Sequence, residues 1–312
     1  MATFFIWLLT KIWAAFLAFI LLFVPGARLR GEAIKPLDRA NLKLNFTILA
    51  DVHMESYTFW RFQDLRLALR DIKRAEVKSD ALVLLGDNTM NGQFTEYTQL
   101  YSILSLWNSS KNTLVAMGNH DINHRPIGKA VKRHNHFFNA LTGAKNDKPY
   151  YSRVINGYTF IVLGSEDEKG GLAEDWTYAD FSPAQITWLD AELAKAAESE
   201  KPIFVFNHQP LLEEHWPYGT VVQGEEVFEV LKKYKGVFYF SGHTHYPGGD
   251  FEEADGVYFV NVGHNFSRQG AGGPGYYVEV SDTHILLRLR EFANGKWAHE
   301  EHHIGLKGRV YN

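Results

Sequence analysis

Short, continuous apolar runs recur along the chain between residues 46 and 262. They are rich in Val, Ile, Leu and Phe, and they read FTILA (46–50), ALVLL (81–85), TLVAM (113–117), TFIVL (159–163), PIFVF (202–206), VFYF (237–240) and VYFVNV (257–262). Runs of this kind are typical of strands that are covered on both faces. We therefore expect a buried strand at each of these places.

Amphipathic stretches lie between several of these runs. Residues 94–108 and 224–235 carry apolar side chains at helical spacing. A further helix is expected to begin after Ser182, the predicted N-cap, with Pro183 at the first helical position and Gln185 completing a capping box. Because helices alternate with strands, the pattern predicts an α/β protein whose sheets lie between helices.

The last quarter of the chain has a different pattern. From about residue 275 to 297, apolar and polar side chains alternate with a period of two, and a turn-like segment interrupts them at residues 281–283. Such alternation predicts an antiparallel hairpin.

The N-terminal segment is the most apolar part of the sequence. Residues 4–24 read FFIWLLTKIWAAFLAFILLFV and contain no polar side chain apart from Thr10 and Lys11. A helix of this length would cross the hydrocarbon core of a bilayer. We predict a membrane anchor at residues 1–24, a linker at 25–42 and a globular domain at 43–312.

A secretory signal removed near Gly26 or Ala33 is the alternative interpretation of this segment. The retained anchor is favoured because Arg28 and Arg30 follow at once and the small-residue cleavage pattern is poor. Basic side chains follow the segment and none precedes it, which favours a cytoplasmic domain on a cell membrane.

Composition excludes several classes of protein. The net charge of -4 comes from interspersed charges of both signs, so no basic surface indicates an obligate nucleic-acid partner. The chain has no cysteine, which excludes disulfides, thiolate nucleophiles and Cys-ligated metals. A metal ion in this protein must be bound by His, Asp, Glu or Asn.

Polar side chains of these types follow five of the apolar runs. They are Asp51, His53, Asp87, Asn119, His120, His208, His243 and His245. In α/β sheets, ligands bind outside the carboxyl ends of the strands, so we expect these side chains to converge.

Leaving His120 aside, seven oxygen and nitrogen donors are too many for one tetrahedral ion. They suit two ions of the Mn, Fe or Zn kind with a carboxylate between them. Two such ions form the usual clamp for in-line displacement at phosphorus and activate a water as hydroxide. His120 lies beside Asn119, is not needed as a ligand, and could protonate the leaving group.

The ordered motifs resemble those of the calcineurin-like metallophosphoesterases. The motifs are DxH (51–53), GD (86–87), GNHD (118–121), an isolated His208 and GHTH (242–245), and the resemblance covers residues 45–264. It implies a four-layer α/β/β/α sandwich over the domain at 43–312, with a dinuclear site between the sheets. It assigns Asp51, His53 and His245 to one metal, assigns Asn119, His208 and His243 to the other, makes Asp87 the bridge and places His120 at the leaving group.

One position departs from the family pattern. Many members carry a second Asp three residues after the Asp of the GD motif, where it orients the leaving-group histidine, and this chain has Met90 there. A thioether is only a weak acceptor. Either Asn91 or Asp121 takes over this role, or the substrate has a good leaving group, as phosphodiesters and pyrophosphates have.

The sequence therefore predicts a metal-dependent phosphoester hydrolase at a membrane, acting on a phosphodiester, pyrophosphate or phosphomonoester. The expected cofactors are two divalent or trivalent ions. The expected partner is a phosphorylated small molecule or a lipid-linked substrate, the latter favoured by the predicted anchor. The alternative is a non-catalytic metal-binding scaffold or interaction module with the same fold, which the presence of all eight site residues disfavours.

Overall fold

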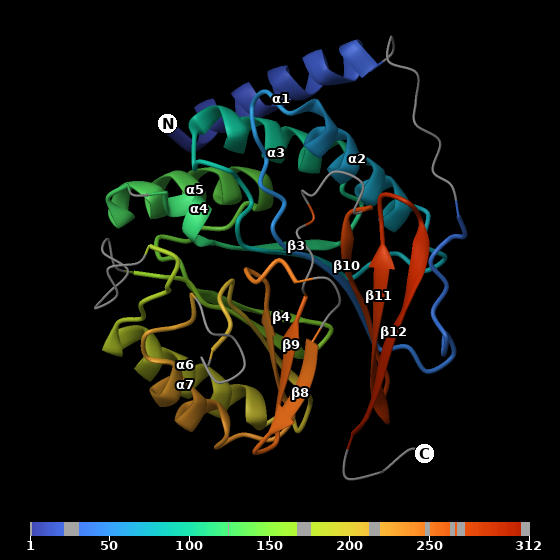
Figure 1. Cartoon of the computed structure of the whole chain (residues 1–312), viewed down its shortest axis with the longest axis vertical. Coiled ribbons are helices and arrows are strands. Elements are labelled where there is room, and N and C mark those ends of the chain that lie inside the picture. The colour runs from blue at the N-terminus through green and yellow to red at the C-terminus, as the bar shows by residue number, and fades with distance from the viewer. Residues whose placement is uncertain are drawn as a thin grey trace.

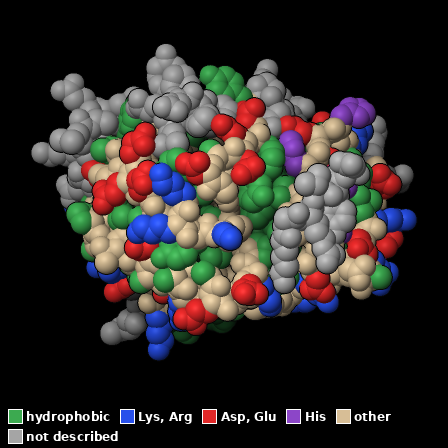
Figure 2. All heavy atoms as spheres, turned by 90° about the horizontal axis from the view of Figure 1, so that it is seen from below, with side chains coloured by type: hydrophobic (Ala, Val, Ile, Leu, Met, Phe, Trp, Pro, Cys, Tyr) green, Lys and Arg blue, Asp and Glu red, His purple; other side chains and the backbone are tan. Residues whose placement is uncertain are grey.

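The computed structural model describes residues 2–21, 31–123, 125–166, 176–211, 219–246, 250–262, 266 and 272–306. Two six-stranded sheets lie face to face, and helices cover their outer sides (Figure 1). The predicted mixed α/β class is confirmed. Acidic and basic side chains are interspersed on the face seen from below, as the composition indicates (Figure 2).

The first sheet combines parallel and antiparallel strands in the order β12-β11-β10-β1-β2-β3. Its strands are β1 (Leu44–Leu49), β2 (Ala81–Leu85), β3 (Asn112–Ala116), β10 (Pro274–Val280), β11 (His284–Glu291) and β12 (Lys296–Gly305). Strands β1, β2 and β3 are parallel, and β10, β11 and β12 form an antiparallel meander next to β1. The carboxyl ends of the three parallel strands therefore share one edge.

The second sheet has the order β4-β5-β6-β7-β9-β8. Its strands are β4 (Tyr151–Ile155), β5 (Tyr158–Val162), β6 (Ile203–Phe206), β7 (Val237–Ser241), β8 (Asp250–Ala254) and β9 (Val257–Asn261). Strands β5, β6, β7 and β9 are parallel, whereas the edge strands β4 and β8 pair antiparallel. All seven predicted apolar runs correspond to strands of these two sheets.

The helices are α1 (Ala2–Leu21), α2 (Phe59–Lys73), α3 (Phe94–Trp107), α4 (Asn119–Ile122), α5 (Ile127–Thr142), α6 (Pro183–Ala197) and α7 (Gly224–Leu231). Helices α2, α3 and α5 lie over the first sheet, and α6 and α7 lie over the second (Figure 1). The predicted N-cap of α6 is confirmed, because Ser182 Oγ accepts a hydrogen bond of 3.2 Å from the Gln185 N–H. The predicted capping box is wrong: the Gln185 side chain bonds to the main chain of Gly164, and Glu166 Oε2 accepts from the Ser182 N–H at 3.1 Å instead.

Aromatic side chains fill the space between the sheets. The Phe46 ring of β1 lies 5.1 Å from the ring of Phe160, 5.0 Å from that of Phe204 and 6.3 Å from that of Phe240, all of which belong to the second sheet. These four side chains have no exposed surface. Such edge-to-face packing holds the two sheets together and fixes the relative positions of the strand ends that carry the site.

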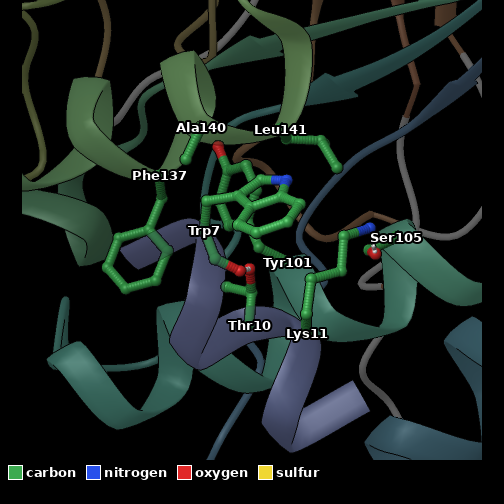
Figure 3. Close-up of a pocket in the computed structure, with 8 residues that line it drawn as sticks. All are labelled: Trp7, Thr10, Lys11, Tyr101, Ser105, Phe137, Ala140 and Leu141. Atoms are coloured by element: carbon green, nitrogen blue, oxygen red, sulfur yellow. Dashed lines mark hydrogen bonds between the residues drawn. The ribbon is translucent and has the colours of Figure 1, made fainter. Parts of the chain in front are cut away.

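The N-terminal helix lies against the protein. The Lys11 ammonium donates to Ser105 Oγ of α3 at 2.6 Å, and Ser102 Oγ donates to the Thr10 carbonyl at 3.1 Å. Trp7 and Lys11 line a small pocket together with residues of α3 and α5, including Tyr101 and Phe137 (Figure 3). No predicted site residue contributes to this pocket.

The predicted membrane anchor at residues 1–24, and the cell-membrane location inferred from it, are wrong. Over the ranges that the structure describes, no helix combines the length and the apolar character needed to cross a bilayer. Helix α1 buries Ile6 and Thr10, and Thr10 bonds to α3, while Phe4, Phe5 and Ile12 on its other side are exposed. Residues 22–30, which include the end of the predicted anchor and the start of the predicted linker, lie outside the described residues.

Candidate metal centre

The predicted site residues follow strands of both sheets. Asp51 and His53 follow β1, Asp87 follows β2, Asn119 and His120 follow β3, His208 follows β6, and His243 and His245 follow β7. The strand ends of the two sheets meet at one place, because His208 Nε2 lies 3.2 Å from Asp87 Oδ2 and His245 Nε2 lies 3.1 Å from Asp51 Oδ1.

Four of these side chains form a first cluster. Asp51, His53, Asp87 and His245 each offer one ligand atom, and these atoms all lie within 4.8 Å of one another. The Nε2 atoms of His53 and His245 are 3.2 Å apart. Two carboxylates and two imidazoles at this separation are a donor set that suits Mn, Fe or Zn.

A second cluster shares one residue with the first. It consists of Asp87, His208 and His243, whose ligand atoms also lie within 4.8 Å of one another. His243 Nδ1 and His208 Nε2 are 3.2 Å apart. Asp87 therefore lies between two groups of donors, which is the position of a bridging carboxylate.

Asn119 adds an unused acceptor beside these clusters. Its side chain is buried, and its Oδ1 has no hydrogen-bond partner within the described part of the chain. An unsatisfied buried oxygen costs about 1–3 kcal/mol, and a cation would remove that cost. The next residue, His120, donates its main-chain N–H to Asp87 Oδ1 at 2.8 Å. The residues present therefore fit a pair of metal ions.

Five site residues have backbone conformations that side chains other than glycine rarely adopt. The φ angles are +56° at Asp51, +44° at His53, +45° at Asp87, +71° at His243 and +57° at His245. Each such residue costs of order 1–3 kcal/mol, and strain of this kind gathers at functional sites. The turns that follow the strands are thus shaped to aim these side chains inward.

Gly86 allows the two sheets to approach each other closely. Its φ is +88°, and a Cβ there would lie 2.5 Å from the Cβ of His208. Only glycine combines this conformation with this contact.

Asp121 joins the turn after β2 to the turn after β3. Its Oδ1 accepts from the N–H and the hydroxyl of Thr89 at 3.0 and 2.7 Å, and its Oδ2 accepts from Gly118 N at 3.0 Å. Asn88 donates to Oδ2 through its main-chain and side-chain N–H groups, at 3.2 and 2.9 Å. This buried carboxyl group fixes Asp87 relative to Asn119 and His120.

Asn261 supports the histidines that follow β7, and the sequence analysis missed it. Its Nδ2 donates to the Gly242 carbonyl at 2.9 Å, and its Oδ1 accepts from Thr244 Oγ1 at 3.0 Å. Its signal in the sequence is a single amide within the otherwise apolar run at residues 257–262.

Burial and neighbouring charges set the protonation of the site. Burial raises the pKa of Asp87, but the His208, His53 and His120 imidazoles outweigh it and hold this pKa below its ordinary value. Burial lowers the pKa values of His53 and His243 to about 4, so both imidazoles are neutral at neutral pH, as metal ligands must be.

His208 has the opposite shift. Burial lowers its pKa, but the Asp87 carboxylate overrides burial and raises the pKa to about 9. In the metal-free protein His208 therefore carries a proton, which an arriving cation would displace.

His120 is oriented by the main chain. Its Nδ1 makes a hydrogen bond of 2.8 Å with the Met90 carbonyl, and its Nε2 lies 4.0 Å from Asp87 Oδ2. The two residues expected to replace the missing Asp make other contacts. Asp121 accepts hydrogen bonds from the turn after β2, and the Asn91 side chain donates to Glu96. The group that contacts Nδ1 of His120 is therefore the main-chain carbonyl of Met90 and not a side chain.

The His120 ring lies between two other rings. The centroid of His53 is 4.6 Å away and that of Trp176 is 4.9 Å away, both edge-to-face. Trp176 had no signal in the sequence, since it belongs to none of the five motifs.

Comparison with known proteins identifies similar chains. A family model described as calcineurin-like phosphoesterase matches residues 44–247. A manganese-dependent ADP-ribose/CDP-alcohol diphosphatase from Bos taurus is 31% identical over 90 residues, which are 26% of this chain and 25% of that protein. The match thus spans about a quarter of the relative's length.

Two solved structures have the same fold. A dimetal phosphatase from Danio rerio has a TM-score of 0.67 at 16% identity, covering 85% of this chain and 100% of that chain. GAP50, described as the anchor in the inner membrane complex of Plasmodium, has a TM-score of 0.56 at 14% identity, covering 85% of this chain and 90% of that chain.

Proposed function

The chain belongs to the calcineurin-like phosphoesterase family, and we propose that it is a metal-dependent hydrolase of phosphoester bonds. The observation that carries the proposal is the position of Asp87, which shares its carboxylate between two clusters of donors. One cluster would hold one cation through Asp51, His53 and His245. The other would hold a second cation through Asn119, His208 and His243.

Two cations in this site would stabilise negative charge on the phosphoryl oxygens and make a water molecule easier to ionise. Mn, Fe and Zn all suit the donor set, and Mn is the first to test because the partial relative from Bos taurus is named manganese-dependent.

The protein's own residues would orient the substrate and supply a proton. His120 is partly exposed and its Nε2 points toward Asp87, so this nitrogen can reach the oxygen that leaves phosphorus. The bond from Nδ1 to the Met90 carbonyl fixes the proton on Nδ1 when the ring is neutral, which leaves Nε2 to exchange the catalytic proton. The Trp176 ring would line the substrate site on the same side as His120.

We propose a diphosphate bond as the first substrate class, with phosphodiesters and phosphomonoesters next. The partial relative is a diphosphatase by name, and a phosphate leaving group needs less protonation than an alcohol. A membrane-proximal, lipid-linked substrate is not proposed, since the predicted anchor that favoured it is not supported.

The test is a substrate screen of purified protein reconstituted with Mn²⁺. It should include ADP-ribose, a CDP-alcohol, bis(4-nitrophenyl) phosphate and 4-nitrophenyl phosphate. Turnover of at least one, lost on chelation and in Asp87→Ala, is expected. A metal-loaded protein that hydrolyses none of them would favour a non-catalytic scaffold.

A further inference from the structure

The position of His120 depends on a main-chain carbonyl. The group that accepts from its Nδ1 is the Met90 carbonyl, at 2.8 Å. The position of a main-chain carbonyl depends on the conformation of the turn to which it belongs. The segment from Met90 to Gln93, here called the 90–93 turn, therefore helps to set the position of the His120 ring.

Glu96 of α3 holds this turn from one side. Its side chain is buried, and Oε2 accepts from the main-chain N–H groups of Asn91 at 2.9 Å and Gln93 at 3.0 Å. Its Oε1 accepts from Asn91 Nδ2 at 2.9 Å. Both carboxyl oxygens are thus used on the turn.

Two residues between α4 and α5, and one residue of α5, hold the turn from the other side. Asn123 Nδ2 donates to the Asn91 carbonyl at 3.1 Å, and the Arg125 guanidinium donates to the same oxygen. The Arg133 guanidinium donates to the Gly92 carbonyl. The turn is clamped between acceptors on α3 and donors beyond β3, with the Met90 carbonyl facing His120.

Helix capping alone does not account for Glu96. A capping box at the start of α3 requires only the bond to the Gln93 N–H. The two bonds to Asn91 lie outside the helix and fix the residue that directly follows Met90. These two bonds therefore stabilise the 90–93 turn and not the helix.

We propose that Glu96 is a positioning residue for proton donation by His120, acting through the 90–93 turn. The inference rests on the proposed function. In the step concerned, the leaving oxygen takes the electron pair of its bond to phosphorus and the proton from His120, while a water oxygen forms the new bond to phosphorus and releases one proton to the solvent, from which His120 is protonated again. Proton transfer needs the two atoms within about 2.6–3.2 Å, so a small displacement of the turn disables it.

The experiment compares two phosphodiesters that differ only in the leaving group. One releases the 4-nitrophenolate ion, which leaves without a proton, and the other releases an alkanol, whose oxygen must be protonated as it leaves. The wild-type protein, Glu96→Ala and Glu96→Gln are reconstituted with Mn²⁺, checked for equal metal content, and assayed for kcat/KM on both substrates.

Glu96→Ala is expected to lower kcat/KM for the alkyl substrate about tenfold or more beyond any loss on the nitrophenyl substrate, since a general acid contributes about 10²–10⁴. Glu96→Gln is expected to keep the wild-type ratio. Its Oε1 can accept from both main-chain N–H groups, and the Asn91 amide can rotate to face the new NH₂ group.

Asp80→Ala is the matched control. Asp80 is also a buried carboxyl group that accepts a main-chain N–H, from Asn45 at 3.0 Å, but it precedes β2 at the end opposite Asp87. This variant should lower the melting temperature and leave the ratio of the two substrates unchanged.

Equal losses on both substrates in Glu96→Ala, or a Glu96→Gln variant that is no better than Ala, would overturn the role of Glu96 while leaving the proposed function intact. A wild-type protein that hydrolyses neither of these diesters nor any substrate of the screen would instead refute the proposed function, and the role of Glu96 with it.

Discussion

Gly118→Ala tests the packing around Asp87, the carboxylate that we propose as the bridge between two cations. A Cβ on Gly118 would lie 2.2 Å from Asp87 Oδ1 and 2.8 Å from His208 Cδ2. Gly118 has φ -111° and ψ 178°, which alanine adopts without strain, so any effect comes from the contact alone. Ordinary contacts are about 3.5–4.0 Å, so Asp87 must move by more than 1 Å.

A displacement of that size is incompatible with metal binding at Asp87. Bonds from a carboxylate oxygen to a metal are about 2.0–2.2 Å and tolerate about 0.2 Å. We expect Gly118→Ala to lose at least one of the two cations, and kcat/KM to fall by roughly 100-fold or more. Metal content is measured by elemental analysis and activity on the best substrate of the screen.

Gly128→Ala is the matched control. Gly128 lies in α5, and a Cβ there would meet no atom within 4 Å. The substitution should leave metal content and activity unchanged and raise stability by up to about 1 kcal/mol, because alanine favours the helix. If Gly118→Ala binds two cations and keeps wild-type activity, the close packing of Asp87 does not matter to the site and our reasoning is refuted.

Three further predictions concern support, pH and metal removal. Asn261→Ala removes the side-chain donor of the Gly242 carbonyl, which keeps only the Thr244 N–H at 2.8 Å, and should weaken metal affinity about 10–100-fold in a chelator competition, with an unchanged affinity contradicting its role. Burial lowers the pKa of His134 from 6.5 to about 4, so between these pH values the unfolded chain binds a proton at His134 and the folded chain does not. The free energy of unfolding should therefore fall by roughly 3 kcal/mol as the pH is lowered from 6.5 to 4. That part of the loss should be absent in His134→Gln when urea unfolding is compared across this range. Chelation should lower the melting temperature of the metal-loaded protein, since bound cations stabilise the folded state by mass action, and an unchanged value would indicate that none was bound.

The strands that could be predicted from the sequence are those buried on both faces. Their apolar runs need no tertiary information to be recognised, as in β2 and β6. The edge strand β8 has only partly buried or exposed side chains, so its sequence DFEEA carries no apolar run. Its pairing with β9 depends on contacts with the rest of the sheet, and the local sequence pattern gives no information about those contacts.

The candidate ligands could be predicted because the site draws each of them from the end of a recognisable strand. The orientation of His120 could not be predicted, because it depends on a main-chain carbonyl in place of a side chain. Every residue has such a carbonyl, so the sequence does not show which one is used. The membrane anchor was predicted wrongly from the apolar residues 4–24, since no helix in the described ranges is long and apolar enough to cross a bilayer.

Crystallographic anomalous scattering from the Mn²⁺-loaded protein tests the central claim most directly. We predict two peaks roughly 3.5–4 Å apart, one on each side of the Asp87 carboxylate. No peak at Asp87, or a single peak that leaves His208 and His243 without a cation, would contradict the shared site.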